Sequence, residues 1–281
     1  MIHRPRRSAL FMPAGNARAV DKARTLACDV VILDLEDAVA PSAKDAAREA
    51  MVAAVAAGGF GSRELVVRVN AASTPWGQVD LAAVAAARPN AVLLPKVDDA
   101  GAIADARRVT GDLPLWAMIE TARGIVNLPA IAAAPGLAVL VAGTNDLARD
   151  LRVTPGAERL PLLAHLSAII AAARAFGLVA LDGVHNAIDD GGGLAAECAQ
   201  GLAWGFDGKS LIHPKQIAAC HAAFTPSAEA VARAQALERA WAQAGGDAAG
   251  VVQLDGRMVE QLHLDEARGL LARMRAIGNG A

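Results

Sequence analysis

The chain has 281 residues, with 27 lysines and arginines against 29 aspartates and glutamates, a net charge of -2 and 54% hydrophobic residues. This nearly neutral, core-rich composition argues against extended disorder and against a polycationic nucleic-acid-binding protein. Aromatic residues make up only 3% and tyrosine is absent, so stacking platforms for nucleic acid and an aromatic membrane belt are not expected. We therefore expect neither nucleic acid nor a membrane as a partner.

The N-terminal residues do not have the pattern of a signal peptide. Arg4, Arg6 and Arg7 are followed by an apolar stretch that ends at Pro13, which is too short for a signal-peptide core. The uncharged run at 124–145 is long enough for a bilayer, but prolines interrupt it. We therefore expect a cytoplasmic protein.

Short apolar runs alternate along the chain with Ala-rich stretches of helical period, which is typical of repeated β–α units. The predicted strands span residues 8–12, 30–36, 65–70, 91–97, 115–120, 137–143, 179–184 and 206–212, with helices between them. Residues 30–33 and 138–141 do not alternate apolar with polar, as expected for parallel strands covered on both faces. Eight such strands predict an α/β fold, the (β/α)8 or TIM barrel. The alternative, an open doubly wound sheet, lacks its glycine fingerprint in the first turn, residues 13–16.

The chain continues beyond the eighth predicted strand. We expect a helix from Pro214, another over 227–244, a short strand over 251–254 and a last helix from about Val259. The stretch 245–250 is glycine-rich and has the composition of a flexible hinge. We accordingly assign residues 1–224 to the barrel and residues 225–281 to a C-terminal helical extension.

Polar side chains are concentrated where the predicted strands end. The carboxyl ends of barrel strands form the active site in this fold, so these side chains are expected to converge. A solvated, charged barrel rim would explain any one of them, but a series from several strands favours a site. In chain order they are Asp34, Glu36, Asp37, Arg68, Asn70, Lys96, Glu120, Thr121, Asn145, Asp146, Asp182, Lys209 and His213.

Two carboxylates from neighbouring strands, Glu120 and Asp146, would raise each other's pKa unless a cation lay between them. Oxygen ligation by two protein carboxylates, completed by water and substrate, is typical of Mg²⁺ rather than Zn²⁺. The alternative is a carboxylate pair shared with a lysine or arginine of the rim. No histidine pair has ligand spacing, and Cys28, Cys198 and Cys220 lie far apart, so neither a zinc site nor a disulfide framework is expected.

Two groups of cations are candidates for anion binding. Arg68 interrupts an apolar strand and needs an anion, either Glu36 or Asp37 as a structural pair or a substrate carboxylate or oxyanion. Arg18 and Lys22 follow a Gly-Asn turn at the start of the first helix, where a phosphate could bind. A solvated, charged helix face is the alternative for the second group.

Several motifs occur together in one order along the chain. They are Arg7-Ser8-Ala9-Leu10-Phe11-Met12-Pro13, Asp34-Leu35-Glu36-Asp37-Ala38-Val39, Arg68-Val69-Asn70, Pro95-Lys96-Val97, Glu120-Thr121-Ala122-Arg123-Gly124, Gly205-Phe206-Asp207-Gly208-Lys209 and Ile212-His213-Pro214. Together they resemble the citrate lyase β-subunit-like family, which includes malyl-CoA and citramalyl-CoA lyases within the HpcH/HpaI aldolase superfamily.

The resemblance implies a Mg²⁺-dependent barrel enzyme, usually a trimer or hexamer, that breaks or forms a carbon–carbon bond in a β-hydroxyacyl thioester. It implies metal ligation by Glu120 and Asp146 and an oxo-acid-binding role for Arg68. Glu36 and Asp37 are then expected among the catalytic residues, with Lys96 beside them as a substrate-binding residue of the rim. Arg18 and Lys22 match residues that contact the phosphates of CoA.

The acid/base residue of the family's CoA lyases is an aspartate in a Gly-x-Met-x-Asp segment of the C-terminal tail, supplied across a subunit interface. Here the segment is Gly256-Arg257-Met258-Val259-Glu260, so that glutamate replaces aspartate and adds one methylene. Three outcomes are accordingly open for Glu260. It acts as the base in place of the aspartate, it favours another acyl group or thioester hydrolysis, or it marks a poor lyase. The resemblance also implies that the extension acts as a lid on a neighbouring subunit.

The expected function is therefore a Mg²⁺-dependent lyase that cleaves or forms malyl-CoA, citramalyl-CoA or a similar thioester, with an oxo acid and an acyl-CoA as the other pair. One alternative is a citrate lyase β subunit that acts on a citryl thioester of an acyl carrier protein partner. The other is an aldolase for free 2-oxo acids.

Overall fold

The computed structural model describes residues 4–245, 250–254 and 256–278. The chain divides into two compact units. One unit is Arg6–Phe224, and the other contains the described residues from Thr225 onward together with Arg4 and Pro5. None of the described helices is long and apolar enough to cross a membrane.

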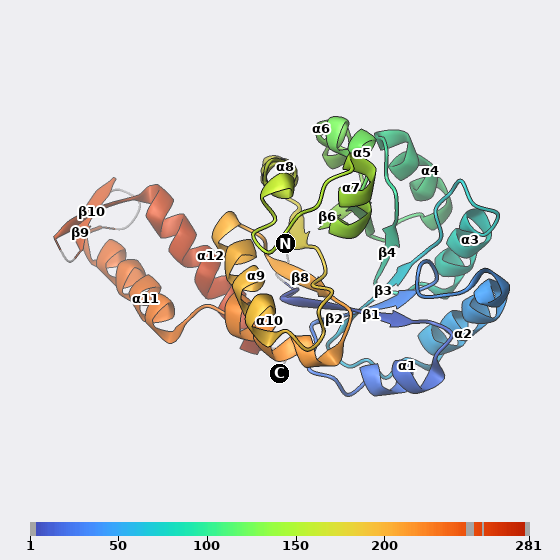
Figure 1. Ribbon diagram of the computed structural model, residues 1–281. Coiled ribbons are helices and arrows are strands. Elements are labelled where there is room, and N and C mark those ends of the chain that lie inside the picture. Colours follow the sequence, from blue (N-terminus) through green and yellow to red (C-terminus); the bar gives the residue numbers. More distant parts are fainter. Residues whose placement is uncertain (1–3, 246–249, 255, 279–281) are drawn as a thin grey trace. The chain divides into compact units, whose positions relative to one another are not determined.

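Eight parallel strands close into a barrel in the order of the chain. Figure 1 shows these strands with helices around them. The barrel closes where β1 pairs with β8, with Leu10 opposite Leu211. The predicted (β/α)8 barrel is thus confirmed. The strands are β1 (Ser8–Pro13), β2 (Val30–Asp34), β3 (Glu64–Arg68), β4 (Ala91–Leu94), β5 (Leu115–Ile119), β6 (Leu137–Ala142), β7 (Val179–Asp182) and β8 (Gly208–Leu211).

Several observed strands end one to three residues before their predicted ends. The apolar pattern continues beyond the regular strand because the first loop residues remain buried, as Leu35 and Val69 do. These buried loop residues hold the following polar side chains close to the barrel axis, where a site can form.

Helices surround the barrel, and two apolar layers result. On β2, Val30 and Ile32 belong to the cluster inside the barrel, while Val31 and Leu33 pack between the strands and the helices. Burial on both faces explains the continuous apolar runs. The helices of this unit are α1 (Ala17–Ala23), α2 (Lys44–Ala57), α3 (Gly77–Ala87), α4 (Ala100–Thr110), α5 (Ala122–Val126), α6 (Leu128–Ala132), α7 (Thr144–Leu151), α8 (Leu163–Ala175), α9 (Gly191–Trp204) and α10 (Ile217–Phe224), with short 3-10 turns at Pro41–Ala43, Leu160–Leu162 and Pro214–Gln216.

The C-terminal unit consists of two helices and a β-hairpin: α11 (Ala228–Gln243), β9 (Val251–Leu254), β10 (Arg257–Glu260) and α12 (Gln261–Gly278). The predicted start of the last helix at about Val259 is wrong, because Val259 pairs with Val252 in the antiparallel hairpin. Both valines pack with Trp241 and Leu264 in a small apolar core, which the local helical pattern did not reveal. Part of the predicted hinge, residues 246–249, lies outside the described residues.

Candidate active site

A cavity of about 360 Å³ opens at the carboxyl ends of the barrel strands. Four carboxylates and one guanidinium line it, among apolar side chains from five strand ends. The charged residues are Asp34, Asp37, Arg68, Glu120 and Asp146, and the apolar ones include Phe11, Pro13, Met118, Ala142, Val184 and Ile212. Acidic and apolar surfaces therefore meet around a single arginine.

Arg68 is held by three carboxylates. Its Nε and Nη2 donate to the two carboxylate oxygens of Asp34, each at 2.7 Å. Its Nη1 lies 3.0 Å from Glu36 Oε2 and 3.3 Å from Asp37 Oδ2. Burial alone would lower the pKa of Arg68, but the hydrogen bonds to Asp34 and the neighbouring negative charges raise it above its ordinary value. The guanidinium is consequently a fixed cation with one face over the Phe11 ring, 4.7 Å from its centroid.

The sequence predicted Glu36 or Asp37 as the structural partner of Arg68, and both contact it. The nearest, bidentate partner is however Asp34, which the sequence reasoning had not paired with Arg68. Asp34 and Arg68 lie opposite each other in the β2–β3 register. Such a cross-strand relation depends on register, and residues separated by 34 positions give no local sign of it.

A second ion cluster surrounds Lys96, which follows β4. Its Nζ lies 2.6 Å from Glu36 Oε1, 3.2 Å from Asp146 Oδ2 and 3.9 Å from Glu120 Oε1. The backbone N–H of Lys96 donates to Glu120 Oε1 at 2.7 Å. Glu120 and Asp146 thus share a cation of the rim here, which is the alternative arrangement that the sequence left open beside a metal.

Glu120 is 3% exposed. Burial, and next the charge of Glu36, raise the pKa of Glu120 to about 8, although Lys96 acts in the opposite direction. Gly143 leaves the room that this side chain needs, because a Cβ there would come 2.5 Å from Glu120 Cβ and 2.7 Å from Oε2. The carboxylate is therefore packed tightly into the wall of the cavity. The charge of Lys96 does not fully offset the cost of burying its negative charge.

The raised pKa of Glu120 predicts a pH dependence of folding in metal-free protein. Its pKa is about 8 in the folded chain against 4.5 as the ordinary value, so the folded state keeps a proton that the unfolded state has lost. The resulting stabilisation is fully present below the lower value and is lost as the pH rises through the higher one. The free energy of unfolding is measured in EDTA across this pH range, with Glu120→Gln as the reference. The unaltered protein should lose stability relative to this variant as the pH rises. Parallel pH profiles of the two proteins would contradict the prediction.

The donor set fits a hard divalent cation. Glu120 and Asp146 present carboxylate oxygens to the same cavity, and these are the ligands that Mg²⁺ prefers. Residues 4–245, 250–254 and 256–278 contain no group of three or more His, Cys, Asp or Glu side chains arranged to hold a metal. Two carboxylates with further positions left to water and substrate would match the habit of Mg²⁺.

Lys44 is a buried residue of this region that the sequence reasoning missed. Its Nζ donates to the carbonyl oxygens of Leu35 and Glu36 at 2.8 and 2.7 Å, and to Asn70 Oδ1 at 2.7 Å. These bonds fix the backbone that carries Glu36 towards Arg68 and Lys96. A helical signal existed, since Lys44 lies in register with the buried face Ala47, Met51 and Ala54 of α2.

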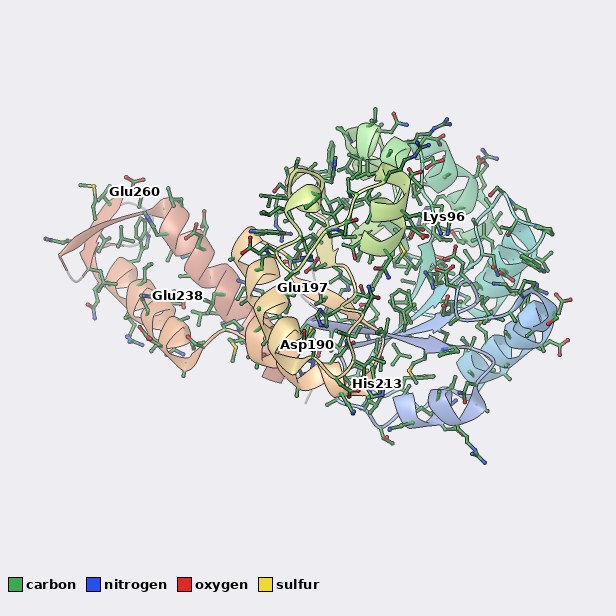
Figure 2. All side chains as sticks on the ribbon, viewed as in Figure 1. Lys96, Asp190, Glu197, His213, Glu238 and Glu260 are labelled. Carbon is green, nitrogen blue, oxygen red and sulfur yellow. The ribbon has the colours of Figure 1, made fainter. Side chains whose placement is uncertain are left out.

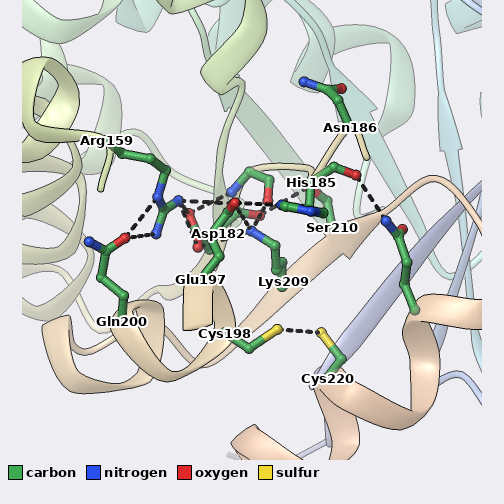
Figure 3. Close-up of polar contacts among 12 residues, drawn as sticks. Arg159, Asp182, His185, Asn186, Glu197, Cys198, Gln200, Lys209, Ser210 and Cys220 are labelled. Atoms are coloured by element: carbon green, nitrogen blue, oxygen red, sulfur yellow. Dashed lines mark hydrogen bonds and ion pairs between the residues drawn. The ribbon is translucent and has the colours of Figure 1, made fainter. Parts of the chain in front are cut away.

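Two of the predicted rim residues, Asp182 and Lys209, are not among the described residues that line the cavity. They contact each other, and Lys209 contacts Glu197 of α9, as Figure 3 shows. Lys209 is fully buried, with its Nζ 3.2 Å from Asp182 Oδ2 and 2.6 Å from Glu197 Oε1. Arg159 and His185 complete this network through Asp182 and Glu197, at 2.7 and 2.8 Å. Side-chain alternation along a strand explains the outcome, because Leu181 takes the inward position.

Of the remaining predicted residues, Asn145 lines the cavity, whereas Asn70, Thr121, His213, Arg18, Lys22 and Glu260 do not. Arg18 and Lys22 are exposed on α1, which follows β1. Glu260 is exposed at the end of β10 in the C-terminal unit, where its N–H donates to His263 Nδ1 at 3.0 Å. Figure 2 labels Lys96 in the barrel unit and Glu260 in the hairpin.

The fold and the cavity define a (β/α)8-barrel protein with four carboxylates and one arginine in a cavity at the carboxyl ends of its strands. The HpcH/HpaI aldolase/citrate lyase family model matches residues 7–214. The chain belongs to this family, which confirms the resemblance seen in its motifs, and it is an enzyme of a family in which lyase activity is established.

Full-length relatives point to the same group. The chain is 45% identical over 273 residues to a (3S)-malyl-CoA thioesterase of Cereibacter sphaeroides, covering 97% of this chain and 96% of the relative. It is 36% identical over 287 residues to the citrate lyase β subunit of Escherichia coli, covering 98% and 95%. CitE of Mycobacterium tuberculosis, solved with magnesium, acetoacetate and coenzyme A, is 34% identical with a TM-score of 0.81, covering 98% of this chain and 100% of that one.

Proposed function

We propose that this chain is a Mg²⁺-dependent carbon–carbon lyase for a β-hydroxyacyl-CoA such as malyl-CoA or citramalyl-CoA, which it cleaves to, or forms from, an oxo acid and an acyl-CoA. The observation that carries the proposal is the convergence of Glu120, Asp146 and Arg68 on one cavity. Oxygen ligands and a guanidinium are suited to a metal and to an oxo-acid carboxylate, respectively. The M. tuberculosis CitE structure, which holds magnesium, an oxo acid and coenzyme A, supports it.

In this proposal Glu120 and Asp146 hold Mg²⁺, which supplies a Lewis acid for the oxygens of the oxo acid. Arg68 donates hydrogen bonds to the oxo-acid carboxylate and to the oxygen on which charge develops. Asp34 keeps the guanidinium in position through its two 2.7 Å bonds. Glu36 and Asp37 act beside Arg68 by balancing its charge.

Glu260 is proposed as the acid/base residue. In cleavage it takes the proton of the β-hydroxyl group, the carbon–carbon bond breaks, and the electron pair moves into the thioester enolate. Return of a proton to the enolate carbon then gives the acyl-CoA. Arg18 and Lys22 offer two exposed cations of α1 for the phosphates of CoA.

Thioester hydrolysis is the second candidate. The 45% identity to a (3S)-malyl-CoA thioesterase along almost the whole chain favours it, as does the replacement of aspartate by glutamate at Glu260. In this reaction water attacks the thioester carbonyl and the CoA thiol leaves, so the carbon–carbon bond stays intact.

The 36% identity to a citrate lyase β subunit keeps an acyl carrier protein as a candidate partner. An aldolase for free 2-oxo acids, the other alternative, would be supported by an essential barrel histidine such as His185. This side chain is bound to Glu197 and does not line the cavity, so the site gives that alternative no support through His185.

The test is a Mg²⁺-dependent assay with malyl-CoA, citramalyl-CoA, citryl-CoA and 3-hydroxy-3-methylglutaryl-CoA in which both product pairs are followed. Carbon–carbon cleavage of malyl-CoA yields glyoxylate and acetyl-CoA, whereas hydrolysis yields malate and free CoA. We expect glyoxylate and acetyl-CoA as the products of the unaltered protein. Glu260→Ala should no longer form them, whereas the matched control Glu266→Ala should form them as before.

If malate and free CoA were the only products of malyl-CoA, the chain would be a thioesterase and not a lyase. Turnover that appears only after an acyl carrier protein is added would indicate the subunit function. No product with any of these substrates or partners would overturn the proposal.

We further propose that the chain forms a trimer or hexamer in which the C-terminal unit acts as a lid on a neighbouring subunit and supplies Glu260 to it. Exposed apolar side chains of that unit support an interface, with Met258 69% and Leu262 53% exposed in the single chain. A cytoplasmic location is proposed as well, in keeping with CoA thioesters as substrates.

A further inference from the structure

The ammonium group of Lys96 occupies the place where three carboxylates come together. It lies 2.6 Å from Glu36, 3.2 Å from Asp146 and 3.9 Å from Glu120. These carboxylates follow different strands, so no short sequence pattern brings them together. One lysine thus contacts all three carboxylates of this cluster.

The backbone of Lys96 serves the same cluster. Its φ of 50° lies in the left-handed region, which non-glycine residues rarely adopt. In this conformation the N–H donates to Glu120 Oε1 at 2.7 Å while the side chain reaches Glu36 and Asp146. Unfavourable backbone conformations that persist in folded proteins are concentrated at functional sites, and this one lies beside the two proposed metal ligands.

The position of Lys96 relative to the cavity differs from that of the carboxylates. Glu120 and Asp146 line the cavity with Arg68, whereas Lys96 is not among the described residues that line it. Lys96 instead lines a second cavity, together with Asn70 and Thr121. Its side chain is one-third exposed, at 33%, so it has room to move.

We propose that Lys96 is a displaceable counter-ion, which holds Glu120 and Asp146 together in the metal-free protein and withdraws towards Glu36 when Mg²⁺ binds. This inference rests on the proposed Mg²⁺ site and assigns Lys96 to metal exchange rather than to substrate binding. Magnesium takes its oxygen ligands at about 2.1 Å, so an ion on these two carboxylates would lie within about 5 Å of the ammonium. Two cations at such a distance repel strongly in a poorly solvated site. Glu36, at 2.6 Å, is the partner that remains for the lysine.

The test measures the affinity for Mg²⁺ without substrate, by calorimetry and by competition with Mn²⁺ followed by electron paramagnetic resonance. Lys96→Met removes the ammonium group and is expected to bind Mg²⁺ about tenfold more tightly or better, because its repulsion of the ion disappears. Arg149, which lies 3.0 Å from Asp146 Oδ1, is left unchanged by this substitution. Lys96→Arg keeps the charge and should remain close to the unaltered protein. The matched control is Lys215→Met, which removes an exposed lysine paired with Asp189 and should change nothing.

Equal or weaker Mg²⁺ binding by Lys96→Met would overturn this inference while the proposed function stands. Failure of the unaltered protein to bind Mg²⁺ would overturn the proposed function together with it. If Lys96→Met folds only with metal, the loaded protein is diluted into EDTA and the release of Mg²⁺ is followed. Slower release than from the unaltered protein supports displacement by the lysine, and equal or faster release contradicts it.

Discussion

Glu120→Gln is expected to weaken Mg²⁺ binding about 100-fold or more and to lower turnover at least as far, since loss of an outer-shell partner alone costs about 10- to 100-fold. The substitution keeps the shape of the side chain and an oxygen that can accept the Lys96 N–H, but it removes the negative charge. Calorimetric Mg²⁺ titration and steady-state turnover measure the two effects. Glu49→Gln, an exposed glutamate of α2, is the matched control.

The stability of Glu120→Gln distinguishes loss of the metal site from damage to the fold. Burial opposes ionisation of Glu120, so the metal-free glutamine variant should be at least as stable as the unaltered protein above pH 8. A loss of turnover accompanied by lower stability would indicate misfolding instead. Unchanged Mg²⁺ affinity in a stable variant would remove Glu120 from the metal site.

The same variant tests whether Glu260 acts across subunits. Glu120→Gln and Glu260→Ala are each expected to be inactive, but co-expression should restore part of the turnover if one subunit supplies Glu260 to the cavity of its neighbour. No recovery in verified mixed oligomers would place both residues in the same chain's site. Glu120 belongs to the barrel unit and Glu260 to the C-terminal unit, so the experiment reports whether the two units meet within one subunit or between subunits.

Arg68→Met is expected to lower kcat/KM by about 100- to 1,000-fold, the effect of removing one donor to a developing oxyanion. It should also destabilise the protein by about 3 to 5 kcal/mol, because the carboxylates of Asp34 and Glu36 lose a buried partner. Thermal unfolding and initial rates measure the two quantities separately. Arg68→Lys keeps the charge but not the bidentate geometry, so it should recover more stability than activity.

The double variant Arg68→Met with Asp34→Asn distinguishes a structural role from a chemical one. Removing the charge of Asp34 relieves the unpaired carboxylate and should restore part of the lost stability. Turnover should stay low, because the guanidinium that faces the oxo acid is still missing. Recovery of turnover along with stability would show that Arg68 acts only as a structural ion pair.

The barrel could be predicted from the sequence because its signals are local. Each β–α unit carries its own apolar run, polar strand end and Ala-rich helix, and their order predicts the parallel barrel. The sequence allowed a set of rim residues to be selected because each lies at or after the end of a strand, and the structure gathers them around one rim: Glu36, Asp37, Arg68, Lys96, Glu120 and Asp146. The hairpin of the C-terminal unit escaped prediction because β10 is a strand only through its pairing with β9.

The sequence by itself thus determined the strand order, the residue types at the rim and the motifs that define the family. Only the tertiary structure decided which of these residues meet. The β2–β3 register gives Arg68 to Asp34, side-chain alternation turns Asp182 away from the cavity, and the left-handed backbone of Lys96 brings it to Glu120. Register and side-chain direction are set by contacts between distant segments, and for that reason a local pattern cannot specify them.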